Sequence, residues 1–198
     1  EFRRVLFRST KMRKKYLLMT KQVNSHEELR KYFKNSKAVF MTGSDQVWGP
    51  VSTGTYDSAY FLDFVPKGNK KIAFASSFGK AKFNEKTMKE YKQYLVQYDK
   101  IAVREDKAVE ILDDMGIESE QVLDPTLLID KNEWSKYITK NVVKEEYVLV
   151  YQIHNDQKLN AYAKMFAKKS GLKLVRVSPI FHQFKRGGKF VYLPDIGE

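Results

Sequence analysis

The sequence predicts an α/β fold built on a doubly wound parallel sheet. Continuous apolar runs of strand length occur at residues 38–42 and 71–75, and such runs are typical of parallel strands that are buried on both faces. A shorter run follows at residues 101–103. Amphipathic helical patterns separate the runs, and this alternation favours a parallel sheet over an antiparallel meander.

The first part of the chain reads as alternating helices and strands. Residues 25–28 (SHEE) form a capping box that opens a short helix. Asn84 caps a second helix, whose apolar residues recur at helical spacing as far as Tyr98. A third helix ends at Gly116, which suits the left-handed position after a helix, and residues 122–123 give a very short fourth strand.

The second part begins a new strand-helix-strand series. Residues 131–146 are charged and lack a sustained period, so we interpret them as a helical connector between domains. Residues 147–152 form a strong strand, and the helix after it ends at Gly171. Further strands are predicted at residues 173–177 and 190–193.

These elements predict two domains, both incomplete. Residues 1–10 resemble translated adapter sequence, so we exclude them from the fold as a non-native stretch. Residues 11–130 form part of a first domain, residues 131–146 the connector, and residues 147–198 the start of a second domain. A lone β-α-β unit leaves its sheet half covered, so we expect the chain to be an internal piece of a longer protein.

The composition excludes several classes of protein. The 198 residues are 42% hydrophobic and 14% aromatic, which suits a packed core and not a disordered chain. The absence of cysteine excludes disulfides, thiolate metal sites and cysteine nucleophiles, and it suits a reducing cytoplasm. No apolar run approaches the roughly 18 residues that a membrane span needs.

The net charge of +12 leaves more than one partner open. Most basic residues are single lysines on predicted helix faces, and no nucleic-acid-binding module is recognisable, so we expect no nucleic-acid partner. A moderately basic face suits anionic substrates and the anionic inner leaflet of a membrane equally well. Peripheral membrane association therefore stays open.

Three polar segments directly follow predicted strands, at residues 43–48, 76–79 and 104–106. Because ligands in open α/β sheets bind beyond the carboxyl ends of the strands, we expect these segments to converge on one edge of the sheet, where a site could form. Each also has a purely structural interpretation: a turn with a helix cap, a strand exit, and a surface ion pair leading into a helix. Arg104 favours a binding role for its segment over the purely structural interpretation, because an arginine at a strand end is suited to bidentate binding of carboxylate or phosphate.

Other candidates are weaker. The histidines at positions 26, 154 and 182 show no metal-ligand spacing, so we predict no metal site. The basic residues 185–189 (KRGGK) form a loop without the pattern of a phosphate-binding P-loop.

Five motifs in a fixed order carry a resemblance to a known family. They are residues 43–48 (GSDQVW), 60–65 (YFLDFV), 71–79 (KIAFASSFG), 103–105 (VRE) and 123–128 (LDPTLL). This series resembles the polysaccharide pyruvyl transferase family, most specifically over residues 38–134. The resemblance implies two Rossmann-like domains of the glycosyltransferase-B type, which face each other across a cleft.

The resemblance also implies a reaction. It implies transfer of a pyruvyl group from phosphoenolpyruvate to sugar hydroxyls of a cell-surface polysaccharide or its precursor, with a glycan or lipid-linked glycan as acceptor and no cofactor. Such an enzyme is expected in the cytoplasm or at the inner face of the membrane. Cationic groups must hold the donor's carboxylate and phosphate, and an acid/base must move a proton.

The family motifs imply roles for particular residues. Arg104 is expected to clamp an anion, and Asp124 to fix the loop that enters the connector. The residues expected to line the cleft are Ser44, Asp45, Gln46, Ser77 and Gly79. The family's acid/base histidine lies in a motif expected beyond residue 198, so no catalytic residue is assigned and we expect residues 1–198 alone to be inactive.

Two alternatives remain. A nucleotide-sugar glycosyltransferase of the same architecture would bind its nucleotide in the second domain. A basic nucleic-acid-binding module would show steeply salt-dependent binding.

Overall fold

The structure is a computed structural model that describes residues 13–51, 54–138, 143–178 and 185–192. The chain divides into two compact units. One unit is Lys21–Asp130, and the other combines Lys131–Glu198 with Glu1–Thr20. The stretch 1–10, set apart as non-native, lies outside the described residues, as does His182.

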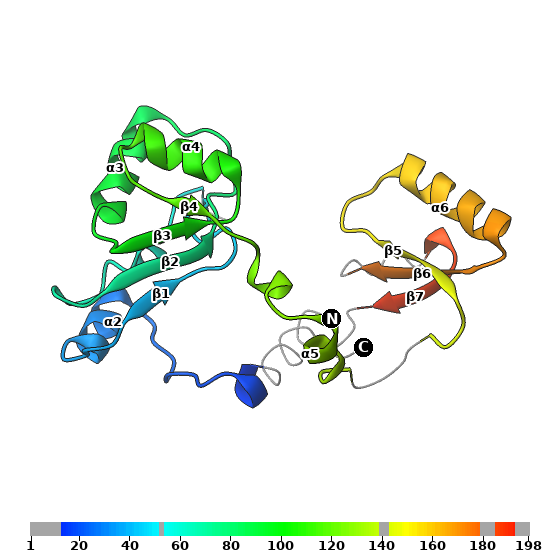
Figure 1. Cartoon of the computed structure of the whole chain (residues 1–198), viewed down its shortest axis with the longest axis horizontal. Coiled ribbons are helices and arrows are strands. Elements are labelled where there is room, and N and C mark those ends of the chain that lie inside the picture. The colour runs from blue at the N-terminus through cyan, green and yellow to red at the C-terminus, as the bar shows by residue number, and fades with distance from the viewer. Residues whose placement is uncertain (1–12, 52–53, 139–142, 179–184, 193–198) are drawn as a thin grey trace. The chain divides into compact units, whose positions relative to one another are not determined.

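The first unit contains a four-stranded parallel sheet (Figure 1). Its strands are β1 (Phe40–Thr42), β2 (Lys71–Ser76), β3 (Lys100–Val103) and β4 (Glu120–Gln121). Every neighbouring pair is parallel, which confirms the predicted α/β class. The fourth strand was predicted two residues too late, at 122–123, because β4 is an exposed polar edge that has no apolar run to mark it.

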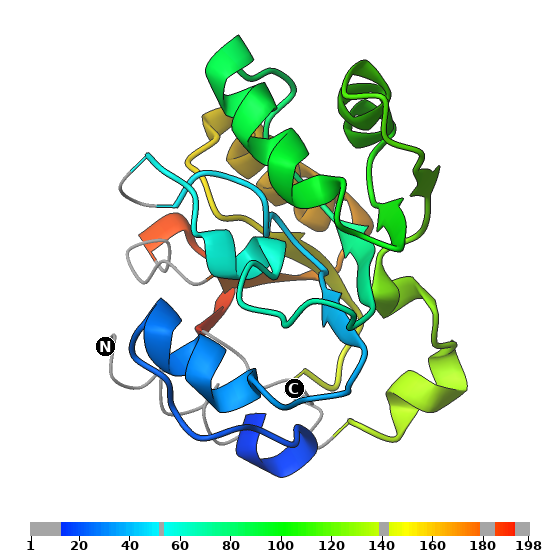
Figure 2. The same ribbon diagram turned by 90° about the vertical axis from the view of Figure 1, so that its left-hand side faces the viewer.

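The helices of this unit lie on both sides of the sheet. Helices α3 (Glu85–Leu95) and α4 (Asp106–Asp114) cover one face, and α2 (His26–Phe33) lies on the opposite side (Figure 1, Figure 2). The four described strands are in sequence order, so two successive right-handed crossovers place α3 and α4 on the same face. The reversal of strand order that defines a doubly wound sheet does not occur among these four strands.

The helix ends form as the sequence predicts. The Ser25 hydroxyl accepts the backbone N–H of Glu28 at 3.1 Å, and the Asn84 side chain accepts that of Thr87 at 2.8 Å. After α4 the chain turns at Gly116, whose φ of 70° lies in the left-handed region.

An aromatic core beneath α3 and α4 fixes the loop that follows β1. Trp48, in that loop, is fully buried with Phe61 from the short 3-10 helix η1 (Ser58–Phe61) and Phe78 from the loop after β2. Tyr91 of α3 donates its hydroxyl hydrogen to the backbone carbonyl of Trp48 at 2.8 Å. The loop therefore has little freedom to move relative to the sheet.

The second unit contains a three-stranded parallel sheet of its own (Figure 1). It is formed by β5 (Tyr147–Tyr151), β6 (Lys173–Ser178) and β7 (Lys189–Tyr192), in that order. Helix α6 (Gln157–Ser170) packs on one face through Ala163 and Ala167 and ends at a left-handed glycine, as predicted. A separate parallel sheet after residue 147 is thus confirmed.

In the sequence between β4 and β5, the described residues form two short helices. The 3-10 helix η2 (Pro125–Leu127) is capped by Asp124, and α5 (Lys131–Ser135) occupies the start of the predicted connector. Across the part of the chain that the structure describes, no helix combines the length and apolar character needed to span a membrane.

Candidate functional site

The three predicted polar segments meet at the carboxyl edge of the first sheet. Asp45 forms a parallel bridge with Ser76, and its carbonyl accepts the N–H of Ser77 at 2.9 Å. The N–H of Trp48 bonds the carbonyl of Ser77 at 3.2 Å. The N–H of Arg104 bonds the carbonyl of Ser76 at 3.1 Å, so the predicted convergence is confirmed.

The backbone at this edge adopts conformations that most residues avoid. Gly43 has φ of +128°, and a Cβ there would lie 1.9 Å from the carbonyl oxygen of Phe74, so only glycine fits. Ala75 has φ of 52°, where the pairing of β2 with β3 shifts register, and Asp45 has φ of 103°. Such clusters of unusual backbone are typical of functional edges and motivate a search for a ligand site here.

A cavity of about 300 Å³ opens at this edge. Gln46, Ser77 and Gly79, three of the predicted residues, line it together with Phe78, Lys80, Ala81, Glu105, Lys107 and Ala108. The Gln46 side chain lies over Gly79, since a Cβ at Gly79 would be 2.7 Å from it. The Ser77 hydroxyl accepts the N–H of Gly79 at 3.0 Å, which fixes the loop that forms this wall.

Arg104 lines a neighbouring cavity of about 420 Å³, beside the loop after β4. The other lining residues are Gln121, Val122, Leu123, Asp124 and Leu127. Ser44 and Asp45 line neither of these two cavities. The structure therefore brings the six predicted residues to one edge, where three line the first cavity, Arg104 lines the second, and Ser44 and Asp45 lie outside both.

Three carboxylates surround the Arg104 guanidinium. Its Nε donates to Glu105 at 2.9 Å and its Nη1 to Asp124 at 3.1 Å, while Nη2 lies 3.8 Å from Asp45. The bond to Glu105, followed by that to Asp124, raises the pKa of Arg104. Bonds from Thr126 and then from Arg104 lower the pKa of Asp124.

These contacts bear on the interpretation of Arg104. The segment is an ion pair leading into a helix, since Glu105 stands at the N-cap of α4 but uses its carboxylate on Arg104. Asp124 fixes its loop, as expected, by accepting both the N–H and the hydroxyl hydrogen of Thr126. An anion clamp at Arg104 stays a prediction, and it requires one carboxylate to leave.

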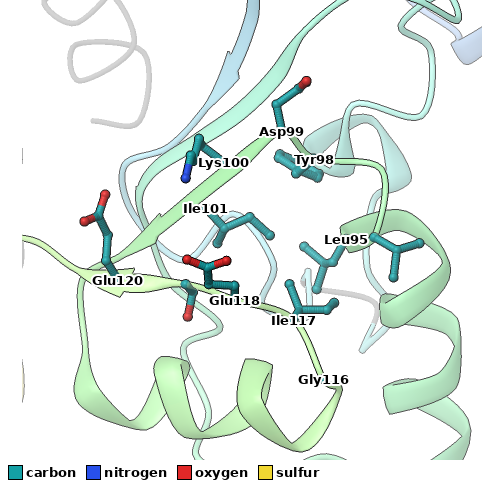
Figure 3. A pocket seen from close by; sticks show the side chains of 11 residues that line it. Leu95, Tyr98, Asp99, Lys100, Ile101, Gly116, Ile117, Glu118 and Glu120 are labelled. Carbon is teal, nitrogen blue, oxygen red and sulfur yellow. The ribbon is translucent and has the colours of Figure 1, made fainter.

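A different hollow lies at the opposite, amino end of the strands (Figure 3). It measures about 410 Å³ and combines an apolar floor of Leu95, Ile101 and Ile117 with a rim that includes Glu118 and Glu120. None of the predicted site residues lines it. Since ligands of open α/β sheets bind beyond the carboxyl ends, the edge containing Gln46 and Arg104 is the better candidate.

The sequence reasoning missed Lys80 and Lys107, which add positive charge to the 300 Å³ cavity. Lys80 directly follows Gly79, and Lys107 lies in the first turn of α4, where it pairs with Glu110. Lysines are so frequent in this chain that adjacency to a motif was the one available signal. Only the folded chain shows which lysines face the edge.

A further polar cluster joins α2 to η1. His26 Nε2 lies 3.1 Å from Asp57, and its Nδ1 lies 3.3 Å from the Ser58 hydroxyl. Ser58 also donates to Asp63 at 2.9 Å, and Arg30 pairs with Asp63 at 2.7 Å. The contacts link two elements that are distant in sequence, so we assign this cluster a structural role. The described residues contain no group of acidic, histidine or cysteine side chains placed to hold a metal ion.

The sequence matches the model of a known family. The model described as Polysaccharide pyruvyl transferase matches residues 3–196, nearly the whole chain. No curated protein matches the sequence.

Proposed function

Because the chain belongs to the polysaccharide pyruvyl transferase family, we propose that it serves the transfer of a pyruvyl group from phosphoenolpyruvate to a sugar hydroxyl. The acceptor is a cell-surface polysaccharide or its precursor, free or lipid-linked. The family match over residues 3–196 carries this proposal. The two parallel sheets support an arrangement of two Rossmann-like domains of the glycosyltransferase-B type.

The reaction places clear demands on the site. The terminal carbon of the enol must gain a proton while a sugar hydroxyl forms a bond to the central carbon; phosphate then leaves, and a second hydroxyl completes a ketal. The donor carries a carboxylate and a phosphate, so cationic groups must hold it. Arg104, Lys80 and Lys107 are the candidates at the carboxyl edge, with Gln46 and Ser77 as neutral hydrogen-bonding groups.

The contacts of Arg104 indicate how an anion would bind there. Its contact with Asp45 is the longest of the three, at 3.8 Å, and the Asp45 side chain is 81% exposed. Asp45 is therefore the carboxylate that a bound anion would displace, while Glu105 and Asp124 keep the guanidinium in place. The anion then accepts charge-assisted hydrogen bonds from Nη2 of Arg104.

The cellular setting follows from the same proposal. Phosphoenolpyruvate is a cytoplasmic metabolite, so we place the reaction in the cytoplasm, at the inner face of the membrane where the acceptor is lipid-linked. The net charge of +12 supports contact with anionic substrates and an anionic leaflet.

Substitution of Arg104 tests the proposal. Arg104→Lys keeps the charge but loses the planar fork, so phosphoenolpyruvate affinity should fall roughly 10- to 150-fold. In the full-length enzyme, affinity is measured by calorimetry, and turnover by phosphate release with a glycan acceptor. Arg30→Lys, a surface change that also keeps the charge, is the matched control.

Two results would contradict this assignment. Thermal protection by a nucleotide sugar, with none by phosphoenolpyruvate, would favour a glycosyltransferase. If Arg104→Ala binds phosphoenolpyruvate as tightly as the wild type, Arg104 has a structural role and does not bind the donor.

A further inference from the structure

The second unit contains a buried arginine on its central strand. Arg176 of β6 is 2% exposed. Its Nε donates to the carbonyl of Gly187 at 2.8 Å, and its Nη1 donates to the side-chain oxygen of Asn160, in the first part of α6, at 2.8 Å. Both acceptors are neutral.

Among the described residues, no acidic side chain compensates the charge of Arg176. Nη2 is buried without a hydrogen-bond partner, and none of the carboxylates that the structure describes pairs with the guanidinium. Burial, followed by the positive charge of nearby Arg186, lowers the pKa of Arg176. A buried charge without a counter-ion is costly, and removal of that cost by an anion would be favourable.

A pair of glycines lets the loop that carries a second arginine approach β6. Gly187 and Gly188 have φ of 80° and 88°, and a Cβ at Gly188 would lie 2.7 Å from the carbonyl oxygen of Leu174. The loop can therefore approach β6 closely only because it lacks side chains here. Arg186 directly precedes this glycine pair, within the basic segment 185–189 that showed no P-loop pattern, and its charge acts on Arg176.

We propose that Arg176 and Arg186 form a binding site for an oxyanion, a phosphate or carboxylate group, in the second unit. The anion accepts the N–H groups of Nη2 and compensates the buried charge of Arg176, and the positive charge of Arg186 adds to its attraction. Because Nη2 is enclosed, the anion reaches it after the loop 185–188 shifts away from β6. This site does not depend on the pyruvyl-transfer proposal.

Nitrogen-15 NMR of the arginine Nε–H groups tests the site in the full chain. Arg176→Met assigns the Arg176 signal by its loss, and Arg104→Met assigns that of Arg104. Inorganic phosphate, and separately acetate, is titrated at constant ionic strength against chloride. The Arg176 signal should shift and saturate with phosphate, acetate or both, which also identifies the preferred anion.

Two variants sharpen the result. Arg186→Met leaves both hydrogen bonds of Arg176 intact and should weaken the anion's affinity roughly tenfold or more. Arg30→Met removes one charge from the other unit and should leave the titration unchanged. An Arg176 signal that does not move, moves equally with chloride, or responds identically in Arg186→Met would overturn the proposal. The Arg104 signal reports separately on the carboxyl-edge site.

Discussion

Arg104 and Arg176 are both held near a central strand of a parallel sheet, yet their surroundings differ in nearly every respect. Arg104 follows β3, its side chain is 25% exposed, and three carboxylates face it. Arg176 lies within β6, is 2% exposed, and bonds two neutral oxygens. Their pKa values accordingly shift in opposite directions, upward for Arg104 and downward for Arg176.

The difference teaches that position at a strand end does not by itself identify an anion site. The Arg104 charge is satisfied within the protein, so a ligand must compete with a carboxylate for it. No acidic side chain in the described ranges pairs with Arg176, so a ligand would meet no competing carboxylate there but must gain access. Burial and partner charge, which a motif does not reveal, decide between these two cases.

The largest expected effect is on stability at Arg176, where two substitutions that both remove the charge differ in the volume they leave filled. Arg176→Met fills most of the buried space, whereas Arg176→Ala leaves a cavity and no side chain above Asn160. We expect the alanine variant to be less stable than the methionine variant by about 2–4 kcal/mol. Urea denaturation measures both. Equal stabilities would mean that the space collapses or that Arg176 is exposed in solution.

A smaller effect is expected at Arg104, where charge matters more than volume. Arg104→Met leaves Asp45, Glu105 and Asp124 facing one another, and we expect a loss of about 1–2 kcal/mol. Added salt should reduce the loss, since the site is partly open and screened. If stability is unchanged at low salt, the three carboxylates do not depend on the guanidinium.

The smallest effect concerns the pH dependence of the Asp124 contact. Its pKa is lower in the folded protein than in the unfolded chain, so its contribution is present above the unfolded pKa and is lost as pH falls through the folded pKa. Asp124→Asn can still accept the N–H of Thr126 but does not titrate. The variant should therefore lose less stability than the wild type between about pH 5 and pH 2. Parallel melting curves across this range would disprove the linkage.

Much of the fold was predictable because local signals agreed with it. Apolar runs marked β1, β2 and β5, although the middle of β1 and most of β5 are not buried. The caps at Ser25 and Asn84 marked helix starts for a similarly local reason. The position of β4 was predicted wrongly because the strand is short, polar and exposed. Its position is set by pairing with β3.

The sequence predicted at which edge of the sheet the candidate site lies, but not how its side chains are arranged. Parallel strands necessarily bring the segments after β1, β2 and β3 together, and the Asp45–Ser76 bridge bears this out. The split of the residues between two cavities depends on how Gln46 folds over Gly79 and how Arg104 turns toward Asp124. These side-chain orientations depend on contacts that form only in the folded protein.

By itself the sequence determined the strand-helix alternation, the parallel pairing it requires, and the family, because each rests on residue order and local periodicity. Tertiary structure alone decided which charges meet. Arg104 acquired three acidic neighbours from residues as far apart as Asp45 and Asp124, whereas Arg176 pairs with no carboxylate of the described residues. The physical reason is that electrostatic energy depends on distance and burial in space, whereas a sequence specifies only separation along the chain.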